Sequence, residues 1–88
     1  MITLERWKTL SVRDHMGHIA SEIMRARRAV GNRALCVAVL ERALLLIDLS
    51  LQDPRWRASA LQLLSLRSQV AEAYVGDGKG LEKLYASL

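Results

Sequence analysis

The chain has 88 residues, enough for one small domain and too few for separate substrate and cofactor domains. Hydrophobic residues make up 51% of it, which excludes an intrinsically disordered protein, and its single proline argues against a turn-rich all-β fold. The net charge is +4 and most of the basic residues are arginine, which is compatible with an anionic partner. Because a single cysteine cannot form an internal disulfide, we expect a cytoplasmic protein. Charged residues interrupt the most apolar stretch (34–51), so we expect no membrane-spanning helix.

The hydrophobic pattern predicts a single all-α domain, residues 1–88, with three long helices and two short ones. In chain order, the predicted helices cover residues of about 3–8, 12–30, 33–50, 54–75 and 81–88. Short connections favour an antiparallel up-down-up three-helix bundle to which the short terminal helices are appended.

Local signals mark the ends of the long helices. Ser11 is the expected N-cap of the first, with its hydroxyl accepting from the Asp14 amide, and Gly31 is expected to end that helix in a left-handed conformation. The Asp-Pro pair at 53–54 predicts the start of the third long helix. The glycine-rich segment 76–80 lacks the spacing of a phosphate-binding loop and is expected to be a flexible linker.

The predicted helix at 12–30 is amphipathic, because apolar residues recur at alternating spacings of four and three. Its expected buried stripe consists of Val12, Met16, Ile19, Ile23, Ala26 and Val30, and its expected exposed face carries Asp14, His18, Ser21 and Arg25. His15 is expected to flank the core. Trp7 and Trp56 are expected to lie near the same end of the bundle and to clamp the N-terminal segment onto the third long helix.

The predicted helix at 33–50 is apolar around most of its circumference, so three helices alone leave part of it uncovered. We therefore expect a homodimer in which this helix is the shared wall. The expected interface residues are Leu35, Val39, Leu45, Leu46 and Leu49. Cys36 lies in the same apolar run and is expected to be a buried structural thiol.

Arg13 and His18 enclose four residues in the sequence Arg-Asp-His-Met-Gly-His. This spacing resembles the R-x4-6-H motif of HEPN ribonucleases, all-helical proteins that dimerise and cut RNA at a shared cleft. The resemblance implies that His18 moves a proton for attack by a ribose hydroxyl while Arg13 stabilises charge on the phosphate. The competing interpretation is a solvated helix face with an ordinary histidine, because five helical positions set the two side chains about 140° apart.

A wider pattern is carried by Trp7, Leu10-Ser11-Val12, His18 through Ile23, Glu41-Arg42-Ala43-Leu44, Ile47-Asp48-Leu49 and, most specifically, Asp53-Pro54-Arg55-Trp56-Arg57. This pattern covers about residues 7–75 and resembles a group of small uncharacterised helical bacterial proteins. The resemblance implies no activity, but it directs attention to the corner at 53–57. In the expected topology Arg55 and Arg57 lie there beside Arg13, and these three residues are the expected anion-binding group.

A metal site is poorly supported. His15, His18 and Glu22, or Asp14 in place of His15, lie on one side of a predicted helix. A bundle metal site needs further ligands from facing helices, and none stands at metal-binding spacing. We expect no metal and no cofactor.

These patterns predict a non-enzymatic helical interaction or oligomerisation module, with contacts from the helix at 33–50 and the apolar flank of the helix at 54–75. Two alternatives stay open. The first is an RNA-binding protein, in its most specific form a HEPN-like ribonuclease that uses Arg13 and His18. The second is an antitoxin-like regulatory partner. The expected partners are a second copy and an unidentified protein. Nucleic acid is not favoured, because aromatic side chains that could stack on bases are scarce, and no membrane partner is expected.

Overall fold

The computed structural model describes residues 2–76, 78 and 80–88, and every regular element in that part of the chain is helical. The elements are α1 (Leu4–Lys8), α2 (Val12–Arg28), α3 (Arg33–Leu51), the 3-10 helix η1 (Pro54–Ser59), α4 (Ala60–Val75) and α5 (Leu81–Ala86). The all-α fold expected from the sequence is confirmed. None of these helices is both long and apolar enough to cross a bilayer.

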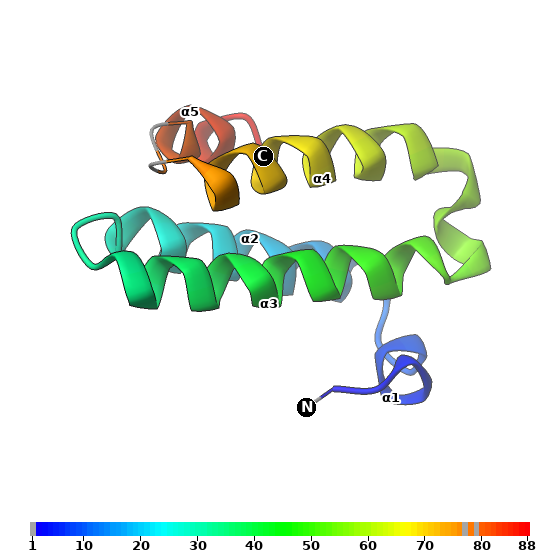
Figure 1. Ribbon diagram of the computed structural model, residues 1–88. Coiled ribbons are helices and arrows are strands. Elements are labelled where there is room, and N and C mark those ends of the chain that lie inside the picture. Colours follow the sequence, from blue (N-terminus) through cyan, green and yellow to red (C-terminus); the bar gives the residue numbers. More distant parts are fainter. Residues whose placement is uncertain (1, 77, 79) are drawn as a thin grey trace.

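The helix α3 is the centre of the molecule and contacts both α2 and α4 along its length (Figure 1). The short helix α5 packs mainly on α2, at the end where α4 stops, and α1 packs on α3 on the side away from α4 (Figure 1). Fully buried aliphatic side chains fill the space between the long helices, among them Ile19, Ile23, Leu40, Ile47 and Val70. Burial of this apolar surface stabilises the fold.

Side-chain caps explain where α2 and α3 begin. Ser11 caps α2 by accepting from the Asp14 amide at 3.0 Å, as predicted. Asn32 caps α3 by accepting from the Leu35 amide at 3.2 Å. The prediction that Gly31 ends α2 in a left-handed conformation is wrong: α2 ends at Arg28 with Ala29 as its C-cap, and among the described glycines only Gly78 has a positive φ, of +80°.

The helix predicted at 54–75 is divided in two, because its first six residues wind as the 3-10 helix η1. Asp53 does cap it, with Pro54 in its first turn. The Asp53 carboxylate accepts from the amide of Arg55, only two residues further on, at 3.0 Å, which favours a tight first turn. Regular α-helix begins at Ala60.

The buried face of α2 is rotated from the predicted stripe. Its buried residues are His15, Ile19, Glu22, Ile23 and Ala26. Val12 and Met16 are only partly buried, and Val30 lies beyond the helix and is 44% exposed. The rotation arises because two polar side chains outside the predicted stripe, His15 and Glu22, are buried.

The linker predicted at 76–80 includes Asp77 and Lys79, which lie outside the described residues. Between them, Gly78 is buried. A Cβ added there would lie 3.4 Å from the side chains of Val30 and Leu81, so this glycine packs closely against the end of the core.

Candidate functional site

The corner where α1, α2 and η1 meet contains buried aromatic rings, which with Ser50 we call the aromatic corner (Trp7, His15, Ser50 and Trp56). The His15 ring stacks on Trp7 with centroids 4.2 Å apart and planes within 8° of parallel. The plane of the His15 ring also lies within 17° of parallel to that of Trp56, with centroids 6.3 Å apart. The expected meeting of the two tryptophans at one end is confirmed, but His15 joins them and is fully buried rather than at the edge of the core.

The partners of His15 define its protonation pattern. Its Nδ1 accepts from the Trp56 indole N–H at 2.9 Å, because an indole nitrogen is a donor only. Its Nε2 lies 2.6 Å from the backbone oxygen of Trp7, which is an acceptor only, so Nε2 carries the proton. Both ring nitrogens are thereby engaged, and the imidazole has no free position for a substrate or a metal ion.

Two further interactions hold the N-terminal segment in this corner. The Trp7 indole N–H donates to Ser50 Oγ at 3.0 Å, which connects α1 to the end of α3. The Arg55 guanidinium donates to the backbone oxygens of Lys8 and Leu10, at 3.0 and 2.8 Å, and so ties down the α1–α2 connection.

A buried carboxylate orients the Arg55 side chain. Asp53 is 4% exposed and accepts from Arg55 through both carboxylate oxygens, the shortest distance being 2.7 Å. The hydrogen bonds from Arg55 lower the pKa of Asp53 to about 2, against the opposing effect of burial. The same pair raises the pKa of the Arg55 guanidinium.

The expected anion-binding group is therefore only partly available. Arg55 uses its guanidinium on Asp53 and two backbone oxygens, whereas Arg13 and Arg57 are exposed. His18, the second member of the ribonuclease-like pair, is also exposed on α2. Its ring lies 5.9 Å from that of Trp7, at an interplanar angle of 52°.

Glu22, which the metal hypothesis used as a ligand, is engaged by arginines instead. Its carboxylate is 9% exposed and lies 2.9 Å from Arg25 and 3.7 Å from Arg42, so it links α2 to α3. Within residues 2–76, 78 and 80–88, no three histidine, cysteine or acidic side chains gather as a metal site would require. Cys36 is 2% exposed, and its thiol donates to the Ala26 oxygen at 3.5 Å, so the buried structural thiol is confirmed.

The residues expected at a dimer interface divide into two groups. Leu46 and Leu49 are buried within the chain, near the end of α3 where α1 packs. Leu35 is 52% exposed, and Val39 and Leu45 are half-buried. We call the accessible surface made by Leu35, Ala38, Val39, Arg42 and Leu45 the open α3 face.

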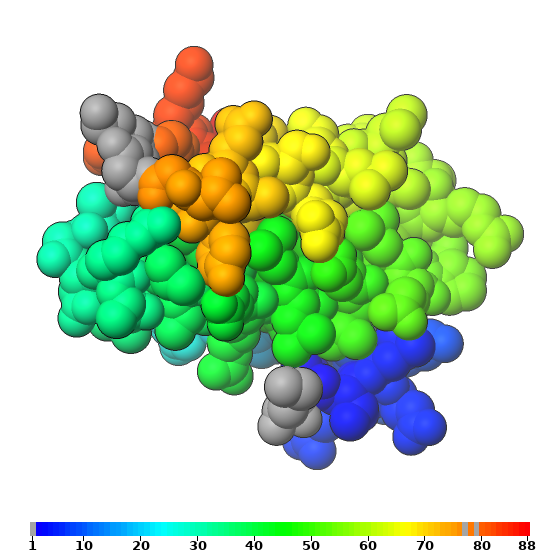
Figure 2. All heavy atoms as spheres, in the orientation of Figure 1, coloured from blue at the N-terminus to red at the C-terminus, as the bar shows by residue number. Residues whose placement is uncertain are grey.

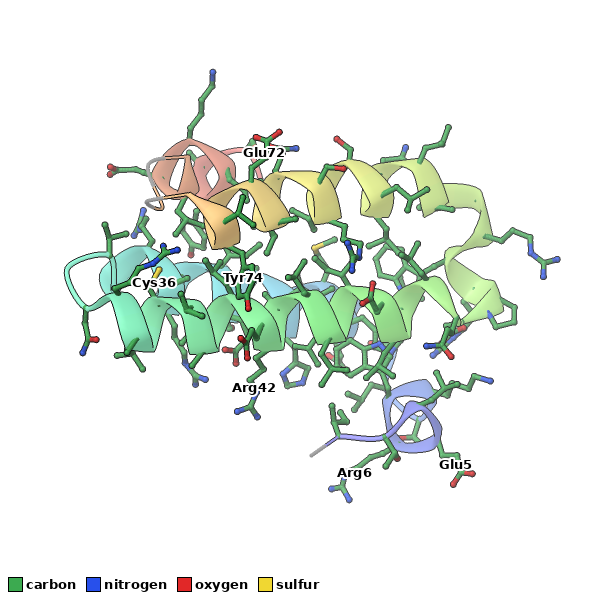
Figure 3. The ribbon with its side chains drawn as sticks, in the orientation of Figure 1. Glu5, Arg6, Cys36, Arg42, Glu72 and Tyr74 are labelled. Carbon is green, nitrogen blue, oxygen red and sulfur yellow. The ribbon has the colours of Figure 1, made fainter. Side chains whose placement is uncertain are left out.

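Two hollows lie on the open α3 face, on the side away from α4. One, of about 430 Å³, is lined by Leu35 and Val39 and bordered by Arg25 and Arg28 of α2. The other, of about 460 Å³, lies against Ile2 and is lined by Ala38, Glu41, Arg42 and Leu45. Figure 2 shows the blue helix α1 protruding beneath α3. In Figure 3, Arg42 projects from this side, whereas Tyr74 reaches from α4 toward α3.

The partners of His15, Glu22 and Arg55 cannot be read from the amino-acid sequence. A helical stripe is indicated by the spacing of four, three and four residues between His15, Ile19, Glu22 and Ala26. Two of these residues are polar, so an apolar pattern does not identify the stripe as buried. Only the positions of the partners in space reveal why this stripe is buried.

No protein-family model matches this chain, and neither the curated proteins nor the solved structures include a similar one.

Proposed function

We propose that the protein is a non-enzymatic helical interaction module whose open α3 face binds an amphipathic helix of a partner protein. The observation that carries the proposal is that α1 covers one end of the outer side of α3, whereas the other end is uncovered, apolar and hollowed. A partner helix on the open α3 face would extend what α1 does within the chain.

The chemistry of the interior supports a binding role over catalysis. The interior side chains suited to proton transfer or nucleophilic attack are already used as structural contacts: His15 on two tryptophans, Glu22 on two arginines and Cys36 in the core. The accessible features are instead apolar side chains beside arginines, which suit recognition by burial and charge.

Charge indicates what the partner helix carries. Arg25 and Arg28 border the open α3 face and Arg42 belongs to it. All three are exposed, and Glu22 and Glu41 offset two of these charges. A helix with leucines along one stripe and glutamates beside it would match both the apolar floor and the basic border.

Fluorescence anisotropy with a labelled probe tests this proposal. The probe is a designed 18-residue peptide with leucines at helical three-four spacing and glutamates elsewhere; the control peptide has the same composition in scrambled order. We expect the patterned peptide to bind the protein and Leu35→Glu to abolish that binding. The matched variant Leu61→Glu, on exposed α4, is expected to bind as the parent does. Equal binding of the two peptides, or binding unaffected by Leu35→Glu, would reject the proposal.

An RNA-directed function is the second candidate, because Arg13 and His18 are both exposed on α2. Its sharpest form, a HEPN-like ribonuclease, predicts that His18→Ala abolishes cleavage of a labelled RNA while the fold is kept. An antitoxin-like regulatory role would use the open α3 face for a specific partner and is a special case of the first proposal.

The side-by-side packing of α2, α3 and α4 supports the proposed up-down-up three-helix bundle. A homodimer with α3 as its shared wall would use Leu35, Val39 and Leu45, since Leu46 and Leu49 are buried by the chain itself.

A further inference from the structure

The helix α5 fills only part of the space between α2 and α4. Both of these long helices pack on α3 but make few contacts with each other, and α5 contacts them both, reaching α4 only near its C-terminal end (Figure 1). With 6 residues α5 is about 9 Å long, against about 24 Å for the 16 residues of α4. In the arrangement of a four-helix bundle, α5 is therefore a fourth helix of less than half the length of its neighbours.

The packed face of α5 shows which side chains this space accepts. Leu81 and Leu84 are buried and Tyr85 is half-buried. The Tyr85 hydroxyl donates to Met24 Sδ at 3.5 Å, and the Arg27 guanidinium lies over the Tyr85 ring, 4.6 Å from its centroid. The chain itself thus places an amphipathic helix here, with a stripe of leucine and tyrosine turned toward α2.

A hollow of about 360 Å³ continues this space beyond the end of α5. Its apolar lining consists of Met16 of α2, Trp56 of η1, Leu63 and Leu66 of α4, and Leu84 and Leu88 at the α5 end. Leu88 stands four residues after Leu84, so the apolar stripe of α5 leads into the hollow. We call the hollow and the space that α5 occupies, taken together, the α2–α4 groove.

The direction of α5 would carry a longer helix over the hollow. Leu81, at the start of α5, lies beside Val30, which follows the C-terminal end of α2. Leu88 borders the hollow together with Met16, which lies near the N-terminal end of α2. The helix α5 therefore runs opposite to α2. A helix that begins as α5 does and continues to about 16 residues would match the length of α4 and cover the hollow.

The polar residues that line the hollow are uncharged: Gln62, Ser65 and Gln69 of α4, and Ser87. The open α3 face is bordered by arginines instead. A helix that suits the hollow therefore carries uncharged polar residues beside its apolar stripe. Its binding depends little on salt, whereas salt weakens the binding of an acidic helix to the open α3 face.

We propose that the α2–α4 groove binds an amphipathic helix of a partner protein, which replaces α5 and completes a four-helix bundle. The first two turns of the partner helix take the positions of Leu81, Leu84 and Tyr85, and its later turns fill the hollow. A helix as short as α5 is marginally stable by itself, because few hydrogen bonds offset the ordering of its first turn, so a longer helix competes with it effectively. This groove is separate from the open α3 face, so either proposal can fail without the other.

Fluorescence anisotropy with a labelled peptide of about 16 residues, the length of α4, tests the proposal. The peptide repeats residues 81–88 and then continues with leucines at the same spacing, separated by glutamine and alanine; the control peptide has the same composition in scrambled order. We expect the patterned peptide to bind, with an affinity that changes less than about twofold between low and high salt. Tyr85→Ala removes the contacts of α5 with Met24 and Arg27 and is expected to tighten binding by about fivefold, because α5 then competes less well.

Two exposed serines of α4 provide a matched pair of variants. Ser65 lines the hollow, whereas Ser68, about one turn further along α4, is not part of its lining. Ser65→Trp places a large ring in the hollow and is expected to weaken peptide binding by about tenfold or more. Ser68→Trp, and Leu35→Glu on the open α3 face, are expected to bind the peptide as the parent does.

Equal binding of the patterned and scrambled peptides, or binding that Ser65→Trp does not weaken, would overturn the proposal. So would a Tyr85→Ala variant that binds no more tightly than the parent, since α5 would then not compete for the groove. Loss of binding in Leu35→Glu would place the peptide on the open α3 face and reject the α2–α4 groove. Light scattering of the protein alone checks the remaining occupant: a dimer that Ser65→Trp breaks would show that a second copy fills the groove, and would reject the partner helix.

Discussion

Replacing Trp56 with phenylalanine tests whether the aromatic corner is held by hydrogen bonding to His15. The substitution keeps an aromatic ring but removes the indole N–H that donates to His15 Nδ1. A change of tautomer cannot compensate, because Nε2 would then present a lone pair to the Trp7 oxygen 2.6 Å away. A buried polar atom left without its partner costs about 1–3 kcal/mol. Since each kcal/mol lowers the Tm of a domain this small by roughly 4–8 °C, we expect Tm to fall by roughly 4–24 °C.

The matched control is Trp7→Phe, which removes the same atoms. Its hydrogen-bond partner, Ser50, still donates to the Leu46 oxygen at 2.9 Å, so no buried group is left without a bond. The hydrogen-bond loss is therefore nearer 0.5–1.5 kcal/mol, roughly the net value of one such bond. Each variant keeps one tryptophan, whose fluorescence reports unfolding in urea alongside circular dichroism. A cost of Trp56→Phe below about 0.5 kcal/mol would refute the reasoning, as would ¹⁵N spectra of the parent that place the His15 proton on Nδ1.

Three further predictions concern Asp53, a pair of glycines and Cys36. Asp53 has a pKa of about 2 in the folded protein, below its ordinary 3.8, so its stabilising effect is complete above about pH 4 and is lost as the pH falls toward 2. The difference in Tm between the parent and Asp53→Asn should therefore shrink over that pH interval. A difference that stays constant would contradict the ion pair. Gly78→Ala should destabilise the protein by about 1–2 kcal/mol in a urea titration, because φ is +80° at this position. Gly17 lies inside α2 with open space around it, so Gly17→Ala should stabilise the protein by about 0.4–1 kcal/mol in the same titration. Cys36 should react with Ellman's reagent slowly in the native protein and rapidly in urea; fast native labelling would show that the thiol is accessible.

The helical content and most helix ends follow from short-range patterns. Ser11 and Asp53 cap helices by bonding to amides three and two residues further on, and such local bonds are readable from the sequence. Cys36 is buried as predicted, because an uninterrupted apolar run must be covered on several sides. The prediction at Gly31 failed because α2 ends at Arg28, and the turn is closed by the Asn32 backbone amide, which donates to the Ala29 oxygen at 2.8 Å.

The candidate surfaces required the tertiary structure. The sequence predicted five residues of α3 as one interface, and only the tertiary packing divides them into the buried Leu46 and Leu49 and an accessible remainder. The sequence also predicted that Arg55 binds anions. In the folded protein its guanidinium instead donates to Asp53 and to the backbone of the α1–α2 connection.

The amino-acid sequence by itself thus determined an all-α domain, its main caps and the burial of its thiol. These depend on backbone hydrogen bonds and apolar periodicity over a few residues. Only the tertiary structure decided which polar side chains are interior and which apolar ones remain outside. His15, for example, is buried because its partners, Trp7 and Trp56, are 8 and 41 residues away and are brought to it only when the helices pack.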